Sequence, residues 1–177
     1  MGMKSFLSDE LILLEPLERV HIDGNYRNWF NDPEVVRQNS HGRFPMTQRK
    51  LESYVTSTES NMSLLVLAVI LREQQVHVGN ISLQNIDWVD RNAEIAFILG
   101  EQKYRGKGIM FRAGQLLIQH AFNSLNLHRI YCGTLDSNIS MKKLAIKLGM
   151  REEGRRQDAV YKHGQYIDVV EFGMINA

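Results

Sequence analysis

The chain has 177 residues, which is enough for one domain with a sizeable core. Hydrophobic residues make up 44% and charged residues 23%, close to the globular average, so the composition excludes a disordered or fibrous chain. Lys and Arg total 21 and Asp and Glu total 20, and this near-neutral balance argues against a dedicated nucleic-acid binder.

The first half of the chain predicts a strand, three helical segments and a meander of three strands. Pro16 ends the first strand because proline has no N–H for a sheet ladder. Thr47 can cap a helix in which Leu51 and Val55 share one face. Short polar connections between the last three strands indicate antiparallel pairing. The expected strands are residues 11–15, 63–71, 76–86 and 93–99, and the expected helices are residues 21–30, residues 33–37 and the segment after Thr47.

The second half alternates helices and strands. Residues 109–125 place apolar side chains at helical spacing, and Gly149 stands where the left-handed C-cap of a later helix is expected. The chain has no repeat, linker or low-complexity tract, so this order predicts one α/β domain over residues 1–177 with a mixed sheet. The elements expected after residues 109–125 are a strand at 129–135, a helix at 138–148 with Met141, Leu144, Ala145 and Leu148 as its buried stripe, and a hairpin of 155–161 and 166–174.

Cysteine content and the N-terminal residues bear on the cellular compartment. Cys132 is the only cysteine, so no intrachain disulfide can form and the chain suits a reducing compartment. The longest apolar run, residues 64–71, is strand-sized and too short to cross a bilayer. Residues 1–6 lack the apolar region of a signal peptide, and Phe6 breaks the myristoylation pattern. We therefore expect a cytoplasmic protein with no membrane partner.

A glycine loop between a predicted strand and a predicted helix carries a chemical signal. From position 100 it reads Gly-Glu-Gln-Lys-Tyr-Arg-Gly-Lys-Gly-Ile-Met. Gly106 and Gly108 let the backbone turn sharply, and N–H groups at a helix N-terminus suit a phosphate or pyrophosphate. Arg105 and Lys107 add positive charge. The segment matches neither the dinucleotide fingerprint nor a Walker A loop, and taken by itself it favours a tight β–α turn with solvated charges.

This loop is one of five short motifs that stand in order over nearly the whole chain. The first is Arg105-Gly106-Lys107-Gly108-Ile109. The other four are residues 92–96, residues 126–131, Asn138 with residues 147–150, and residues 153–154 with Asp168. Together they resemble the motifs of GNAT N-acetyltransferases, and most of all those of the ribosomal-protein-alanine N-acetyltransferase branch. In that family the first motif has the form Gln/Arg-x-x-Gly-x-Gly/Ala.

The resemblance implies the GNAT fold, an α/β architecture with flanking helices. Its mixed, mostly antiparallel sheet splits between two parallel central strands, the one before the glycine loop and the one after the long helix. The co-substrate acetyl-CoA would lie in the split, with its pyrophosphate on the amides of Arg105, Gly106, Lys107, Gly108, Ile109 and Met110. Its pantetheine arm would pair with the backbone of Ile98, Leu99 and Gly100, unless these residues simply end a strand. Asn138 would bond the arm, cap the next helix, or do both.

The resemblance also implies a reaction, in which a primary amine directly attacks acetyl-CoA in a ternary complex. Glu94 is the candidate general base, because it lies on the strand that would flank the thioester and the amine must lose a proton before attack. The alternative is that Glu94 only orients its neighbours. Two departures favour a rival, a non-catalytic acyl-CoA-binding or sensor module. Met110 replaces the last Gly or Ala of the signature, and Ala145 stands where related enzymes carry an acid-providing Tyr.

The acceptor side is expected to come from the early helices, at residues 29–37 and 38–45, and from the late hairpin at 161–166. Its polar residues suit a peptide N-terminus, a polyamine or an amino-sugar nucleotide, although the absence of acidic clustering lowers the polyamine interpretation. Residues 29–35 also resemble a segment of nucleotide-sugar N-acetyltransferases.

No metal is expected, since the six histidines show no ligand spacing such as His-Glu-x-x-His. Cys132 lies in an apolar strand and is interpreted as a small core residue rather than a nucleophile. The expected partners are acetyl-CoA and an amine, and both a monomer and a homodimer are compatible with the sequence.

Overall fold

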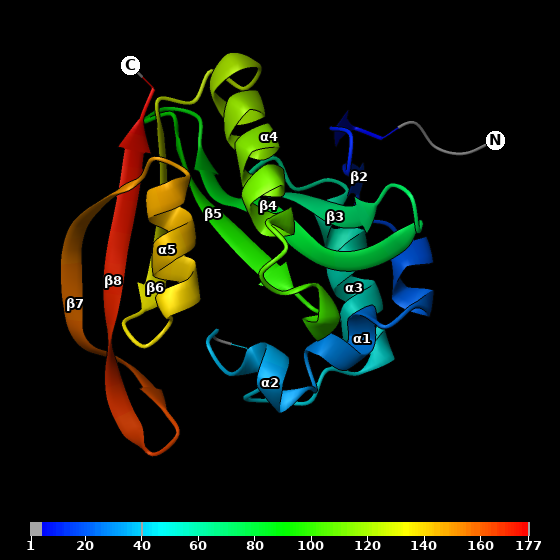
Figure 1. Cartoon of the computed structure of the whole chain (residues 1–177), viewed down its shortest axis with the longest axis horizontal. Helices are drawn as coiled ribbons and strands as arrows, with labels where there is room; N and C mark the ends of the chain where they lie inside the picture. Colours follow the sequence, from blue (N-terminus) through cyan, green and yellow to red (C-terminus); the bar gives the residue numbers. More distant parts are fainter. Residues whose placement is uncertain (1–4, 40, 177) are drawn as a thin grey trace.

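The computed structural model describes residues 5–39 and 41–176, so residues 1–4 of the N-terminal segment considered above lie outside the described residues. Eight strands form one sheet in the order β1-β2-β3-β4-β5-β6-β8-β7 (Figure 1). The strands are β1 Leu7–Ser8, β2 Ile12–Pro16, β3 Leu65–Leu71, β4 Val76–Asp87, β5 Asn92–Leu99, β6 Arg129–Leu135, β7 Arg151–Lys162 and β8 Gln165–Ile175. The helices are α1 Tyr26–Trp29, α2 Pro33–Val36, α3 Gln48–Thr58, α4 Ile109–Asn123 and α5 Ile139–Lys147, with 3₁₀ turns η1 Arg19–Asp23 and η2 Gln102–Tyr104.

The sheet contains one parallel pair, and this pair is short. β5 and β6 are in register only from Asn92 opposite Arg129 to Glu94 opposite Tyr131, although β5 continues to Leu99 and β6 to Leu135. Beyond Glu94 the two strands diverge (Figure 1). All other neighbouring strands are antiparallel. The fold is therefore the GNAT fold expected from the sequence, with a mixed sheet split between two parallel central strands.

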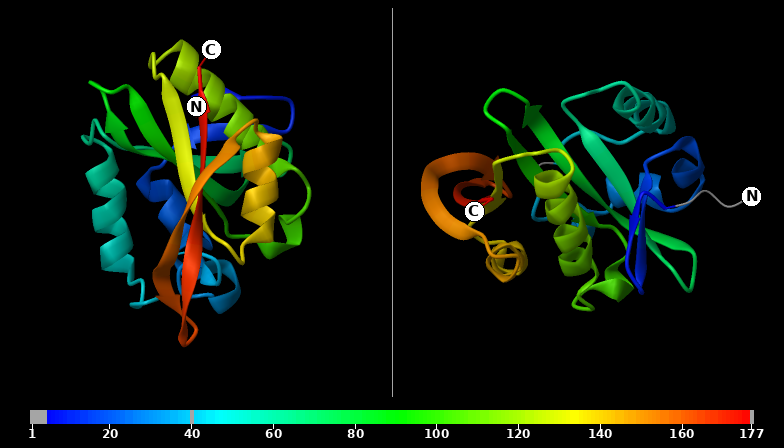
Figure 2. Two further views of the ribbon diagram at one scale, coloured as in Figure 1. Left: turned by 90° about the vertical axis from the view of Figure 1, so that its left-hand side faces the viewer. Right: turned by 90° about the horizontal axis from the view of Figure 1, so that it is seen from above.

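Helices cover both faces of the sheet, and this explains the apolar run in β3. α4 and α5 pack on one face, and η1, α1 and α3 pack on the other (Figure 2). Leu67 and Val69 of β3 join the core under α4, whereas Val66 and Ala68 join the core under α3. A strand buried on both faces reads as a continuous apolar run rather than an alternating one.

Most expected helices and strands are found within a few residues, and the cap of α3 is as expected, because the Thr47 side chain accepts from the Lys50 N–H. The helix expected at residues 21–30 is wrong. It is two short pieces, η1 and α1, separated at Gly24, whose backbone is extended. Strand β1 was not expected, and β7 begins at Arg151, four residues before the expected start. In α5 only Ala145 of the expected stripe is fully buried.

Two features are not found in the part of the chain that the structure describes. Within it, no helix is long and apolar enough to cross a bilayer. Nor does a group of three or more His, Cys, Asp or Glu side chains gather there that could hold a metal ion. The expectations on metal and location remain predictions.

Candidate functional site

The glycine loop adopts the conformation that its sequence indicates. Gly106 has φ +76° and Gly108 has φ +75°, a left-handed backbone that disfavours residues with side chains. Gly108 is the N-cap of the 15-residue helix α4. The Arg112 N–H donates to the Gly108 carbonyl at 3.1 Å, so the N–H groups of the three preceding residues have no acceptor inside the helix. Free N–H groups and the positive end of the helix dipole favour an anion here.

The basic side chains of this loop are not equally available. Arg105 Nη2 donates to the Glu34 carbonyl oxygen at 3.0 Å, which ties the loop to α2. Lys103 and Lys107 each place Nζ 5.1 Å from the centre of the Tyr104 ring. Both lysines are exposed. Lys107 is therefore the cation beside the two glycines that is free to move toward an anion.

A cleft of about 720 Å³ lies against this loop, between the end of β5, α2 and α5. It brings together seven of the ten residues expected to bind the cofactor: Leu99, Arg105, Gly106, Gly108, Ile109, Met110 and Asn138. Ile98, Gly100 and Lys107 are not among its lining residues. Tyr104 and Ser140, which the sequence did not single out, also line the cleft.

The backbone of β5 has one edge that β6 leaves unpaired. On its other edge, the Gly100 N–H donates to the Val78 carbonyl at 2.9 Å, and Ile98 stands opposite Asn80 of β4. Hydrogen bonding alternates along an antiparallel strand, so the N–H groups of Ile98 and Gly100 point to β4 and those of Phe97 and Leu99 point into the split. The N–H groups available on the free edge are therefore those of Phe97 and Leu99, and the expected pairing of the cofactor arm with the backbone of Ile98, Leu99 and Gly100 stays a prediction.

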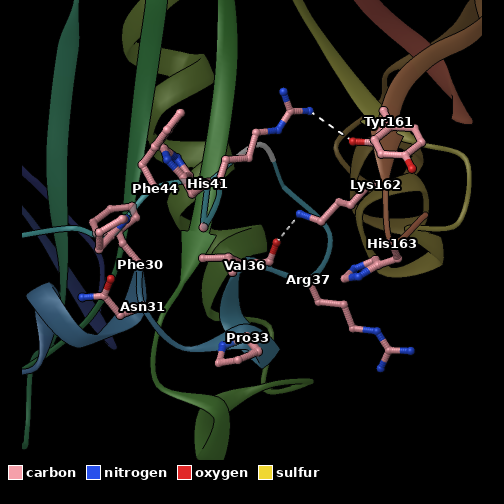
Figure 3. Close-up of a pocket in the computed structure, with 13 residues that line it drawn as sticks. Phe30, Asn31, Pro33, Val36, Arg37, His41, Phe44, Tyr161, Lys162 and His163 are labelled. Atoms are coloured by element: carbon pink, nitrogen blue, oxygen red, sulfur yellow. Dashed lines mark hydrogen bonds between the residues drawn. The ribbon is translucent and has the colours of Figure 1, made fainter. Parts of the chain in front are cut away.

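Two further cavities open on the acceptor side. One, of about 410 Å³, lies under α3 and is lined by residues of β4 and β5, including Ala96, Phe97 and Ile98. The other, of about 690 Å³, is formed by residues near α2 and by the β7–β8 turn (Figure 3). Phe30 and His41 line both of these cavities, and Phe97 lines both the smaller cavity and the cofactor-side cleft. The smaller cavity therefore adjoins the cofactor-side cleft at Phe97 of β5 and the larger cavity at Phe30 and His41.

Glu94 lies outside all three cavities. It sits in the paired part of β5, three residues before Phe97, which corresponds to about 10 Å along a strand. Asn85, which lines the smaller cavity, donates to Glu94 Oε2 at 3.3 Å. Burial raises the pKa of Glu94, and the nearby Glu171 carboxylate raises it further. The carboxylate thus reaches the acceptor side only through Asn85.

Three other candidates have clear surroundings. Asn138 caps α5, because its side chain accepts from the Met141 N–H at 3.2 Å, and it also lines the cleft. Ala145 is fully buried in the core under α4, so no side-chain acid stands at that position. Burial raises the pKa of the Cys132 thiol to about 12, which leaves essentially no thiolate at neutral pH. This supports the interpretation of Cys132 as a core residue.

The chain is similar to known acetyltransferases. Residues 12–151 match the family described as acetyltransferase (GNAT) domain. The uncharacterized N-acetyltransferase p20 of Bacillus licheniformis is 28% identical over 171 residues, covering 96% of this chain and 95% of that protein. The putative ribosomal N-acetyltransferase YdaF of Bacillus subtilis is 34% identical over 97 residues, 55% of this chain and about half (52%) of the relative.

Among solved structures, spermidine N-acetyltransferase from Vibrio cholerae in complex with CoA and spermine superposes with a TM-score of 0.85. It is 22% identical, with coverage of 94% of this chain and 96% of that chain. The likeness supports the same fold, and the family match spans most of the sequence. The chain therefore belongs to the GNAT acetyltransferase family.

Proposed function

We propose that this protein transfers the acetyl group of acetyl-CoA to a primary amine by direct attack in a ternary complex. The observation that carries the proposal is the position of Phe97. At this residue, the cleft beside the glycine loop meets a cavity on the opposite face of the sheet, and the edge of β5 is unpaired. An amine entering from one side can therefore reach a thioester held from the other.

The cleft suits acetyl-CoA in both its charge and its shape. The free amides at the start of α4 and the exposed charge of Lys107 beside them fit a pyrophosphate. The split-facing N–H groups of Phe97 and Leu99 fit an extended amide-containing arm. One preorganised N–H donor to the thioester oxygen is worth about 3 kcal/mol in the transition state. The backbone of β5 would thus bind the donor and polarise it.

The reaction needs no acid at position 145. The neutral amine nitrogen forms a bond to the thioester carbon, and the carbon–sulfur bond breaks so that CoA leaves as a thiolate. The nitrogen loses its extra proton to water, and the thiolate takes a proton from water. With a thiol pKa of about 8.5, leaving as an anion at pH 7 costs only about 2 kcal/mol relative to the protonated product. The loss of the usual Tyr at Ala145 is therefore compatible with turnover.

The departure at Met110 is also compatible with turnover. The Met110 side chain is largely buried, and its methyl group would lie 2.5 Å from a Cβ placed on Gly79 of β4. Because residue 79 is a glycine, the side chain has room between α4 and β4. This removes one of the two features that favour a non-catalytic acyl-CoA-binding module.

For the acceptor, we infer a peptide N-terminus or a small-molecule amine. The five sequence motifs and the similarity to a putative ribosomal N-acetyltransferase support the ribosomal-protein branch. Glu94 is proposed as a residue that positions Asn85 rather than as the group that takes the amine proton, because it lines none of the cavities.

The test is thiol release from acetyl-CoA, followed with a thiol reagent across a panel of primary amines. We expect release that depends on the amine, and the acetylated amine should appear in equal amount by mass spectrometry. CoA binding without release for any amine would favour the non-catalytic module. If CoA did not bind at all, the assignment of the cleft as the acetyl-CoA site would be wrong.

A further inference from the structure

The 690 Å³ cavity between residues near α2 and the β7–β8 turn has a one-sided charge (Figure 3). Its lining contains five basic or imidazole side chains: Arg37, His41, Arg43, Lys162 and His163. No Asp or Glu is among its lining residues. Since the chain as a whole carries a formal charge of only +1 with its histidines neutral, this concentration of basic side chains is a local feature of the cavity.

The cations of this cavity are held in place, but not by acids. Lys162 Nζ donates to the Val36 carbonyl oxygen at 2.6 Å and also to the Asn39 carbonyl oxygen. Arg43 Nη2 donates to the Tyr161 carbonyl oxygen at 3.4 Å. These bonds connect residues more than a hundred positions apart in the sequence. These bonds bring Arg43 and Lys162, which come from the two flanking segments, to the same cavity.

In the part of the chain that the structure describes, no carboxylate forms a salt bridge with the Lys or Arg side chains that line this cavity, which are Arg37, Arg43 and Lys162. The arginines that form such a bridge are Arg112, Arg129, Arg155 and Arg156. Burial lowers the pKa of Lys162, and the Arg43 charge lowers it further. An anion placed between these two side chains would relieve that repulsion.

The cavity also lies where it could hold one end of an amine acceptor whose other end reaches β5. It shares Phe30 and His41 with the cavity that reaches Ala96, Phe97 and Ile98 on β5. The His41 ring packs edge-on against Phe30, with ring centres 4.8 Å apart. A molecule bound across both cavities would have one end among the cations and the other at the free edge of β5.

We propose that this cavity binds a carboxylate or phosphate group of the amine acceptor, while the amine itself extends to Phe97. The proposal rests on the transfer reaction proposed above. It makes the preferred acceptor an anionic amine and disfavours polyamines, whose charges would face Arg43 and Lys162. Arginine binds carboxylates and phosphates alike through paired N–H groups, so either anionic group is suited to this cavity.

The experiment compares kcat/KM for matched acceptors. A dipeptide with a free C-terminus is paired with its C-terminal amide, glucosamine 6-phosphate is paired with glucosamine, and spermidine serves as the cationic amine. At least one anionic member should exceed its neutral partner about tenfold or more, since a hydrogen bond to a charged group contributes at this level. The pair that shows the preference identifies carboxylate or phosphate as the bound group.

Variants at Arg43 then locate the effect. Arg43→Gln should remove most of the anionic preference, mainly through KM, and Arg43→Lys should retain part of it. Arg49→Gln makes the same charge change at an exposed position of α3 that lines none of the three cavities. It should leave the preference for anionic amines intact. Thermal unfolding checks that each variant is folded, and CoA affinity should be unchanged in all of them.

The outcomes separate the two proposals. Turnover that is equal for neutral and anionic amines, or highest for spermidine, would overturn the anion site and leave the transfer reaction standing. Weaker CoA binding in Arg43→Gln would instead assign these cations to the phosphates of CoA and overturn the site. No thiol release with any amine would overturn the transfer reaction, and this inference with it.

Discussion

Replacing Gly108 by valine tests the phosphate site at the start of α4. Gly108 has φ +75°, and no heavy atom lies within 4 Å of an ideal Cβ at this residue. A valine would therefore strain the backbone and fill the space in front of the α4 amides without meeting another part of the protein. Gly164, in the β7–β8 turn, offers a matched control. Its φ is +81°, its surroundings are equally open, and it lies outside the cofactor-side cleft.

Both substitutions should lower the free energy of unfolding by about 1–2 kcal/mol, because a residue with a side chain is disfavoured in the left-handed region. Only Gly108→Val should also weaken CoA binding. Interactions with a helix N-terminus contribute on the order of 1 kcal/mol each, so losing two or three of them corresponds to about a 50-fold higher Kd. At a CoA concentration a hundred times the wild-type Kd, the stabilisation would fall from about 2.7 to about 0.6 kcal/mol.

Thermal unfolding with and without CoA measures these values. For a chain of this size, 1 kcal/mol shifts Tm by about 2–4 °C. We expect CoA to raise Tm by roughly 5–10 °C in the wild type and in Gly164→Val, and by only about 1–2 °C in Gly108→Val. Equal CoA shifts in the two variants would refute the reasoning and place the phosphate groups away from α4.

Two further predictions concern titrating groups. Glu94→Gln should keep CoA affinity and lower the rate less than about tenfold at every pH from about 6 to 9, since the carboxylate reaches the acceptor side only through Asn85. A loss near 10²-fold at neutral pH that recovers at higher pH would identify Glu94 as the base. Burial lowers the pKa of His77 to about 4, so the unfolded chain binds more protons than the folded chain between about pH 6.5 and 4. The free energy of unfolding should therefore be highest above pH 6.5 and fall by about 3 kcal/mol toward pH 4. Urea unfolding of His77→Gln should lose this slope, and an unchanged slope would assign it to other groups.

The sheet and its long helices could be predicted because each has a local signal. The apolar run of β3 is buried on both faces, and α4 begins directly after the left-handed Gly108. The helix expected at residues 21–30 failed where a turn signal, Asp23-Gly24-Asn25, interrupts its apolar pattern. β7 was placed too late because most of its residues are exposed and two register shifts disturb its alternation.

The cofactor side of the site was also visible in the sequence, because the glycine loop is contiguous. The part that the sequence could not supply depends on where β6 leaves β5. β6 pairs with β5 over only three residues, which leaves the later edge of β5 free. The register with β4 then makes Phe97, and not Ile98, the residue whose N–H faces the split. A shift of one residue in this register would reverse which N–H groups are free.

The acceptor side is hidden from the sequence for a different reason. Arg43 and Tyr161, which meet across the cationic cavity, are 118 positions apart, and Lys162 contacts Asn39 over a similar separation. No spacing rule connects such residues. The sequence could name the segments and note that acidic residues are scarce in them, but only the fold shows that three cations of different segments line one space.

Met110 shows why a departure from a family motif has to be judged together with the residue it packs against. Taken alone, a methionine at the last position of the glycine signature looks like an obstruction where the helix approaches the cofactor. In the structure its methyl group occupies the space that a side chain at position 79 would need, and the same Cβ would lie 2.3 Å from the Ile98 carbonyl oxygen. The absence of a side chain at Gly79 therefore has two effects. It lets β4 pair closely with β5, and it leaves room for the first turn of α4 to pack against β4. The bulky residue in the motif and the glycine on the strand therefore compensate for each other, because the Met110 methyl group fills the space that residue 79 leaves free.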